Sequence, residues 1–367
     1  MNNINYLAGL NQFVKLHGIA QGIKQSQLND ILQKINRIEG DGSGSWVGEF
    51  SQVGDNYYQQ KKYDKAMCFY NLARFACFNQ ANNINITKKS IIAFNLWNIK
   101  NGYFFIRDEY VFEEKSIPFY FHKSKNQESP LLIVIGGIVS TKEQWSNILN
   151  IARKLDITTA VLEMPGVGEN ATIYNECSFK LFAQVIIKMN NYANINQIHI
   201  IGLSFGGNLA IRYALKDNRV KSIFTVGAPI LYFYHNYYFS KVPDLTKKIL
   251  SHLCLVDDGS VFDAIKQNGI SNNELKLLNI PVNYVFSLQD EIIPCEEKSL
   301  LIKFIKKLNL YEFDDVHGSP HHMLEIKMIL IRYILSLSNR KKLLNYLLGK
   351  FLTILNFRNK FKSGERV

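Results

Sequence analysis

The stretch Ile198-His-Ile-Ile-Gly-Leu-Ser-Phe-Gly-Gly-Asn-Leu-Ala-Ile-Arg-Tyr213 decides the fold that we expect for this chain. Its first residues are apolar and β-branched, which is typical of a buried strand, and a helical pattern begins just after Ser204. Between the two lies Gly202-Leu-Ser-Phe-Gly206, a G-x-S-x-G motif. The glycines let a strand and a helix pass closely, and the sharp turn exposes the serine hydroxyl beside the free N–H groups of the helix. The alternative is a glycine-rich turn with a structural serine.

Length and composition favour a large protein of a reducing compartment. The chain has 367 residues, which suits a catalytic domain of about 250 residues with an additional module. Its five cysteines are scattered and lack metal-binding spacing, so we predict neither a disulfide framework nor a zinc site. The sequence shows no signal-peptide pattern and no apolar run of about 18 residues. A cytoplasmic protein is therefore predicted.

The net charge of +12 is concentrated at the C-terminal end. Residues 338–367 hold eight lysines and arginines against Glu365 alone, and no nucleic-acid-binding module is recognisable. We therefore predict a solvated basic tail and no nucleic-acid partner. Within it, Leu343 to Phe357 is apolar and flanked by basic residues, which indicates an amphipathic helix. Docking on the protein or pairing of subunits in a homodimer is favoured over contact with an acidic membrane.

The hydrophobic pattern divides the chain into three parts. Residues 1–105 are predicted to form a helical, lid-like N-terminal subdomain, because apolar and aromatic residues recur there at helical spacing. Residues 106–337 are predicted to form the catalytic domain, and 338–367 the basic tail. Within the catalytic domain, 229–279 is read as an inserted cap. Its aromatic cluster from Tyr232 to Phe239 either packs the cap or lines an apolar pocket.

Strands and helices are expected to alternate in the catalytic domain. The expected strands are 110–112, 117–121, 131–135, 158–162, 198–201, 220–226, 281–286 and 308–313. The expected helices are 142–154, 179–189 and 208–215. Such alternation predicts an α/β protein with a mostly parallel sheet covered by helices on both faces.

Three residues at the carboxyl ends of predicted strands form a candidate catalytic triad: Ser204, Asp290 and His317. This is the chain order in which α/β-hydrolases carry a nucleophile, an acid and a base. The competing bases are His321 and His322, which are expected to begin a helix. The competing acids are Glu291, Asp257 and Asp258.

Two backbone N–H groups are candidates for an oxyanion hole. The glycine pair 136–137 ends a strand, so the N–H of Ile138 can point at a substrate oxygen together with that of Phe205. Five further histidines are read as structural because they fall in helical, strand or cap segments: His17, His122, His199, His235 and His252. We predict no metal and no cofactor, because no ligand spacing matches a known metal motif.

Three of these motifs carry a family resemblance: Gly136-Gly-Ile-Val-Ser-Thr-Lys-Glu143, Met164-Pro-Gly-Val-Gly168 and Gly202-Leu-Ser-Phe-Gly-Gly207. Behind a helical N-terminal region, they resemble the 2,6-dihydroxypseudooxynicotine hydrolase-like branch of α/β-hydrolases. That branch includes proteins similar to the fermentation–respiration switch esterase and to polyketide-shortening hydrolases of anthraquinone pathways. The resemblance implies the triad and oxyanion hole named above, with a substrate pocket between helical region and core. The nicotine-degrading relative has an additional active-site carboxylate, whereas the stretch after Val226 offers no acid here.

The predicted activity is hydrolysis of a carbon–carbon bond next to a ketone, a retro-Claisen reaction, in an aromatic or polyketide-like substrate. Aromatic-rich helical and cap segments favour such an apolar substrate, which a carrier could deliver. The same machinery cleaves esters and thioesters, so a carboxylesterase or thioesterase is the alternative. A second alternative is a catalytically silent protein of this fold that binds a partner through its N-terminal helices.

Overall fold

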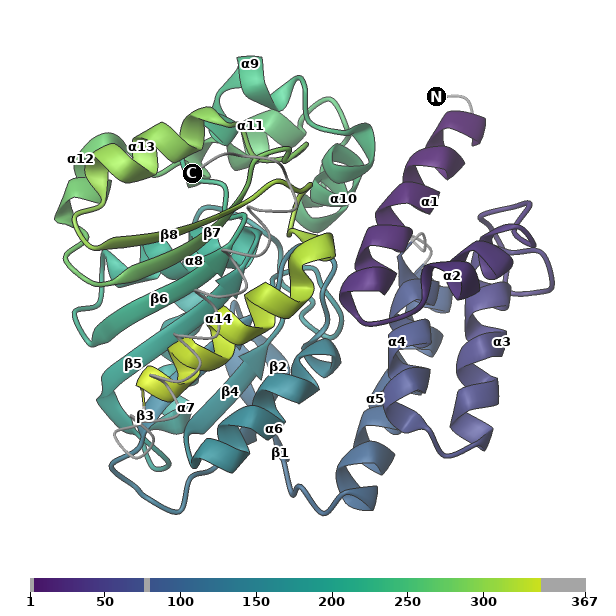
Figure 1. Cartoon of the computed structure of the whole chain (residues 1–367), viewed down its shortest axis with the longest axis horizontal. Coiled ribbons are helices and arrows are strands. Elements are labelled where there is room, and N and C mark those ends of the chain that lie inside the picture. The colour runs from purple at the N-terminus through teal and green to yellow at the C-terminus, as the bar shows by residue number, and fades with distance from the viewer. Residues whose placement is uncertain (1–2, 76–79, 338–367) are drawn as a thin grey trace, which may run out of the picture.

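The computed structural model describes residues 3–75 and 80–337 (Figure 1). An N-terminal group of helices lies beside a twisted sheet that is covered by helices. The predicted amphipathic tail, 338–367, lies outside the described residues. In the described part of the chain, no helix is long and apolar enough to cross a membrane.

The described residues form one eight-stranded sheet with the order β1-β2-β4-β3-β5-β6-β7-β8. The strands are β1 (Ile106–Phe112), β2 (Lys115–His122), β3 (Pro130–Ile135), β4 (Thr158–Leu162), β5 (Asn194–Leu203), β6 (Val220–Val226), β7 (Val282–Ser287) and β8 (Leu308–Phe313). From β4 to β8 every neighbouring pair is parallel, whereas β2 is antiparallel to both β1 and β4. Because the parallel strands end at the same edge, the loops that follow them meet there.

Helices cover both faces of the sheet, as continuous apolar strands require. On one face lie α6 (Ser146–Leu155) and α14 (Met323–Ser336), which cross the front of the sheet in Figure 1. On the other lie α7 (Leu181–Met189) and α8 (Phe205–Ala214). The parallel strands β3 and β4 are therefore buried almost throughout.

The N-terminal helices are α1 (Asn3–Ala20), α2 (Gln25–Leu32), α3 (Trp46–Gln59), α4 (Tyr63–Arg74) and α5 (Gln80–Lys100). Ser45 caps α3 by accepting a hydrogen bond from the N–H of Gly48, and the Trp46 indole donates to the carbonyl of Leu72 in α4. Helix α1 contacts α10 and the short 3-10 turn η5 (Pro320–His322) of the catalytic part. The helical region is therefore packed against the carboxyl edge of the sheet.

The cap between β6 and β7 holds η3 (Tyr232–Tyr234), α9 (Asn236–Phe239), α10 (Asp244–Cys254), α11 (Val261–Ile265), η4 (Lys266–Asn268) and α12 (Asn272–Leu277). After β7, α13 (Glu296–Phe304) leads to β8. The buried carboxylate of Glu297 in α13 accepts hydrogen bonds from the backbone N–H groups of Ile230, Leu231 and Phe233. This contact fixes the start of the cap on the catalytic core.

The predicted fold class is confirmed, and the errors are local. The strands 158–162, 220–226 and 308–313 have the predicted bounds. The helix predicted over 142–154 instead starts as a 3-10 turn, η1 (Lys142–Trp145), before α6. The helix predicted to start at Asn208 starts at Phe205, because Ser204 itself is the turn residue.

Candidate active site

Ser204 lies at the sharp turn between β5 and α8. Its backbone has φ 52° and ψ −126°, a strained combination for a residue with a side chain. The turn requires glycine at position 202, because a methyl group there would lie 2.4 Å from the carbonyl oxygen of Gly206. The N–H of Ser204 donates to the carbonyl of Val226 at the end of the neighbouring strand, at 2.8 Å. The G-x-S-x-G motif therefore forms the elbow that its spacing predicted.

Ser204, His317 and Asp290 form a continuous chain of hydrogen bonds. Ser204 Oγ lies 2.9 Å from His317 Nε2, and His317 Nδ1 lies 2.9 Å from Asp290 Oδ2. The Asp290 side chain is 2% exposed and also accepts from the N–H groups of Ile292 and Ile293. A carboxylate so held fixes the proton on Nδ1, which leaves Nε2 to accept the serine proton.

The surroundings of His317 favour its charged form. Burial disfavours the imidazolium, but the Asp290 carboxylate and the charge of Glu291 outweigh it, so the pKa of His317 is raised. Glu291 contacts this residue through the backbone, accepting the His317 N–H at 3.0 Å. The two carboxylates therefore stabilise the imidazolium that forms when His317 takes the proton of Ser204.

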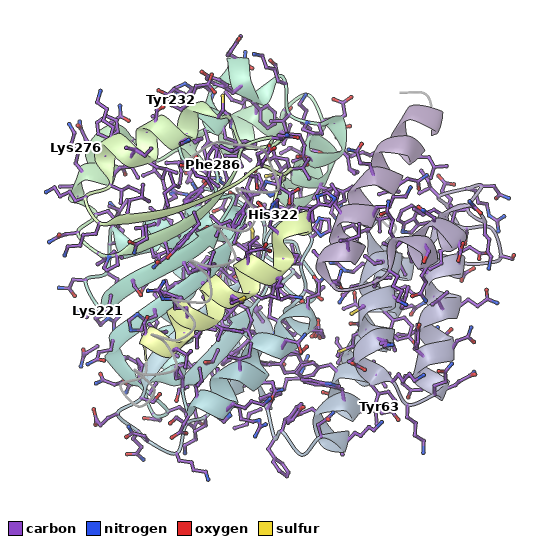
Figure 2. The ribbon with its side chains drawn as sticks, in the orientation of Figure 1. Tyr63, Lys221, Tyr232, Lys276, Phe286 and His322 are labelled. Atoms are coloured by element: carbon purple, nitrogen blue, oxygen red, sulfur yellow. The ribbon has the colours of Figure 1, made fainter. Side chains whose placement is uncertain are left out.

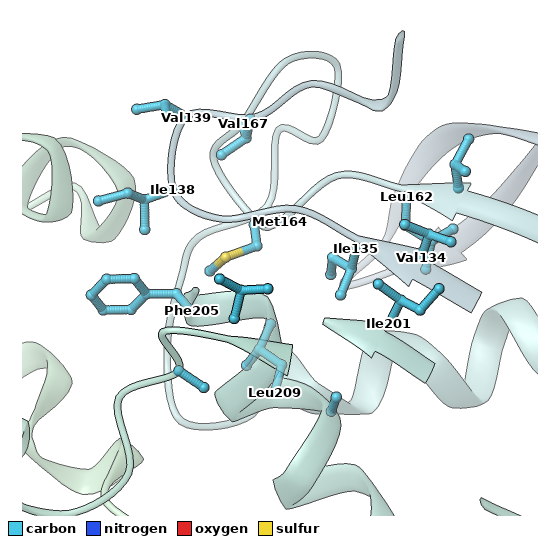
Figure 3. Close-up of a cluster of buried hydrophobic side chains, with 14 of the residues drawn as sticks. Val134, Ile135, Ile138, Val139, Leu162, Met164, Val167, Ile201, Phe205 and Leu209 are labelled. Atoms are coloured by element: carbon cyan, nitrogen blue, oxygen red, sulfur yellow. The ribbon is translucent and has the colours of Figure 1, made fainter. Parts of the chain in front are cut away.

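The loop after β3 passes beside the nucleophile. A methyl group at Gly137 would lie 3.0 Å from Ser204 Cβ. Among the described residues, the N–H groups of Ile138 and Phe205 have no hydrogen-bond partner. The Ile138 and Phe205 side chains are buried at this edge with Met164 (Figure 3). Two unpaired N–H groups beside a serine hydroxyl are suited to bind a developing oxyanion.

Helix α4 holds this loop from the N-terminal side. The guanidinium of Arg74 donates to the carbonyl of Val139, and Thr141 Oγ1 donates to Asn71 Oδ1 at 2.9 Å. The helical region therefore contacts the residues directly after Ile138. This contact gives the N-terminal helices a part in positioning the loop.

A buried ionic cluster lies at the other end of the loop. The Lys142 ammonium, with a fully buried side chain, lies 3.2 Å from Glu143, 3.3 Å from Glu163 and 2.6 Å from Glu169. Burial opposes its charge, but the three glutamates outweigh burial and raise the pKa of Lys142. Burial raises the pKa of Glu163 to about 7, against the effect of Lys142. Glu163 also accepts from the N–H groups of Lys142 and Glu169, so it joins two loops at the sheet edge.

The competing candidates do not contact the His317 ring: Glu291 contacts only its backbone N–H, and the others make separate contacts. His321 and His322 both place Nδ1 against Asp315, at 2.7 and 2.9 Å, and Asp315 also accepts the His321 N–H. Asp258 accepts from Ser251 within the cap. In the part of the chain that the structure describes, no group of three or more His, Cys, Asp or Glu side chains is arranged to hold a metal ion.

The cap aromatics split into packing and exposed residues. Phe233 is fully buried and packs edge-on against Phe205, with ring centroids 5.2 Å apart, and against Phe239 at 5.7 Å. Tyr237, in contrast, is 64% exposed. Phe233 and Phe239 therefore pack the cap onto the elbow, which agrees with the first of the two predicted alternatives for them.

Two residues that act on or respond to His317 are not identified by the sequence: Gly227 and His17. Gly227, after β6, lies against the imidazole of His317 and has a φ of +60°. In the sequence, the only signal for this position is that it is a glycine directly after a predicted strand. The sequence predicts a structural role for His17, because it lies in a helical segment. Its pKa is nevertheless lowered to about 3, first by burial and then by the nearby charge of His317.

Comparisons with known proteins define the class. Residues 130–253 match the α/β-hydrolase fold family, and the sheet order and helix placement agree with it. The chain is a hydrolase of the α/β-hydrolase fold. A comparison with curated protein sequences found no match.

Among solved structures, the chain is similar to AbyA5, with 29% sequence identity and a TM-score of 0.88 over 96% of this chain and 100% of AbyA5. It is also similar to 2,6-dihydroxy-pseudo-oxynicotine hydrolase, with 17% identity and a TM-score of 0.73 over 87% of this chain and 94% of that one. The predicted resemblance to the latter is thus confirmed at the level of the fold. Both similarities include part of the N-terminal helical region, because 96% and 87% of the chain are more than residues 106–367 provide.

Proposed function

We propose that this chain is a serine hydrolase that works through an acyl-enzyme. Ser204 is the nucleophile, His317 the base and then the acid, and Asp290 the residue that orients His317. The N–H groups of Ile138 and Phe205 bind the oxyanion. The observation that carries the proposal is the hydrogen-bonded chain from Ser204 Oγ through His317 to Asp290, on a serine held at φ 52°.

The reaction proceeds in two halves. His317 Nε2 takes the Ser204 proton while Oγ attacks the substrate carbonyl, and the two backbone N–H groups stabilise the resulting negative oxygen. Collapse of this intermediate expels the leaving group, which receives the proton from His317. Water, activated by the same histidine, then attacks the acyl-enzyme and releases the acid.

Within this class we propose that the bond cleaved is a carbon–carbon bond next to a ketone, in an apolar β-diketone or polyketide-like substrate. The leaving group is then a carbanion, which departs when a second carbonyl delocalises its charge. The support is the covered, apolar edge: Ile138 and Val139 are 7% and 8% exposed, and helix α1 packs on η5. Such apolar surroundings favour an apolar substrate. The same triad can also cleave esters and thioesters, so these are the alternative substrates to be compared with the diketone.

The test measures kcat and KM with an aryl β-diketone, an aryl acetate and an acyl thioester. We expect turnover of the diketone to a carboxylic acid and a methyl ketone, lost in Ser204→Ala. Turnover of ester or thioester alone would restrict the proposal to an esterase or thioesterase. Diketone cleavage retained by Ser204→Ala would contradict the acyl-enzyme.

A further inference from the structure

Helix α1 brings His17 to the loop that carries the proposed base. His17 lies in the last turn of α1, and α1 contacts η5, which begins at Pro320 shortly after His317. Figure 2 labels His322, the last residue of η5, at the start of α14 and toward the N-terminal helices. The N-terminal region thus adds a histidine to an edge where the sheet supplies Ser204, Asp290 and His317.

A second set of contacts places His17 toward the oxyanion loop. Its half-buried imidazole packs against Phe13, with ring centroids 4.5 Å apart, and edge-on against Phe75 at 4.8 Å. Phe75 directly follows Arg74, whose guanidinium holds the carbonyl of Val139, next to Ile138. His17 is therefore linked through Phe75 to the residue that holds the oxyanion loop, and its helix contacts the turn that follows the proposed base.

The imidazole of His17 is neutral and has hydrogen-bonding capacity to spare. Burial, followed by the charge of His317, lowers the pKa of His17 to about 3, so the ring carries one N–H donor and one acceptor at neutral pH. In the described part of the chain, neither ring nitrogen takes part in a hydrogen bond. Two phenylalanine rings, Phe13 and Phe75, pack against the imidazole and hold it in place.

We propose that His17 binds the substrate by donating a hydrogen bond to the oxygen of its second carbonyl, the one that does not react with Ser204. This inference rests on the proposed function and names the part of the substrate that the N-terminal helix recognises. A neutral imidazole suits the task, because it polarises a carbonyl and stabilises an enolate without giving up its proton. A carboxylate-bearing substrate would instead require a cation at this position.

The electron balance defines when His17 acts. Ser204 Oγ bonds to the reacting carbonyl carbon, and the carbon–carbon bond then breaks with its electron pair moving to the leaving fragment. That pair is delocalised onto the second carbonyl oxygen, where the negative charge meets the His17 N–H. His317 gives the proton that it took from Ser204 to the carbon of the leaving fragment, so His17 ends the step unchanged. Water completes hydrolysis of the acyl-enzyme.

The experiment compares His17→Phe and His17→Gln with Gln12→Leu, a matched control at an exposed position of the same helix. Phenylalanine keeps the aromatic packing without a polar edge, whereas glutamine restores an N–H donor. Each variant is assayed with the β-diketone and with an aryl acetate, which has no second carbonyl. Thermal unfolding checks that the variants are folded.

We expect His17→Phe to lose at least tenfold more kcat/KM on the diketone than on the acetate, mostly in kcat. His17→Gln should recover part of this difference, and Gln12→Leu should behave as wild type. Equal losses on both substrates, or no advantage of glutamine over phenylalanine, would overturn the role of His17. Failure of the wild type to cleave the diketone in a Ser204-dependent reaction would instead overturn the proposed bond class and this inference with it.

Discussion

Gly227 lies directly against the imidazole of His317. A methyl group at position 227 would be 2.8 Å from His317 Cε1 and 3.2 Å from Nδ1, and it would be 3.5 Å from Asp290 Oδ2. The N–H of Gly227 donates to the carbonyl of Val285 in β7, so its place is fixed by the sheet. The absence of a side chain after β6 thus allows the proposed base and its carboxylate to reach the sheet edge.

Gly227→Ala should therefore reduce activity by moving His317. The φ of +60° adds strain of about 1–2 kcal/mol for alanine. A displacement of the base by about 1 Å is expected to lower kcat roughly 100-fold. Steady-state kinetics measures the loss, with Gly259→Ala as control, because position 259 has open space around it. Unchanged kcat in a folded Gly227→Ala protein would show that His317 does not need this position.

The pH dependence of kcat/KM should report the pKa of His317. As a base it must be unprotonated, so activity rises with pH through its pKa, which burial lowers but Asp290 and Glu291 together raise above the ordinary value of 6.5. Glu291→Gln removes one of the charges that raise this pKa, and the acid limb should move to lower pH. Asp314→Asn, at an exposed carboxylate on the same loop, should leave the limb in place. A limb unmoved by Glu291→Gln, or moved to higher pH, would contradict this assignment.

The ionic cluster around Lys142 should matter for stability. Lys142→Met leaves the buried carboxylates of Glu143 and Glu163 without their cation, which is expected to cost about 3–5 kcal/mol. Lys188→Met breaks the partly exposed pair with Asp108 and should change stability by less than about 1 kcal/mol. Denaturant unfolding measures both. Equal effects of the two substitutions would mean that the buried cluster does not hold the loop after β3.

The fold was predictable because its signals are local. The strands 158–162, 220–226 and 308–313 are short apolar or β-branched runs between turn residues, and such runs define their own limits. The antiparallel pairing of β2 with β4 was not predictable. It depends on which strand of the parallel sheet β2 joins, and the sequence of β2 alone does not specify this. Helix α13 was also not predicted, although it holds Glu297, the residue that fixes the start of the cap.

The site was predictable in part, for a related reason. Ser204, Asp290 and His317 each follow a strand, and the common edge of a parallel sheet brings them together. Lys142 and Glu143 resemble a solvated helix start in the sequence, yet both are buried. The position of His17 depends on a contact between α1 and η5, which are separated by most of the chain. Neither the spacing of residues nor their type predicts such a contact.

Ser204 is the proposed nucleophile, and His317 is the base that activates it. The most direct measurement is the intact mass of the protein after exposure to a fluorophosphonate, with Ser204→Ala and His317→Ala treated in parallel. We predict one adduct on the wild type and none on either variant, because the probe reacts with an activated serine. No adduct on folded wild type, or an adduct that persists in Ser204→Ala, would contradict the account.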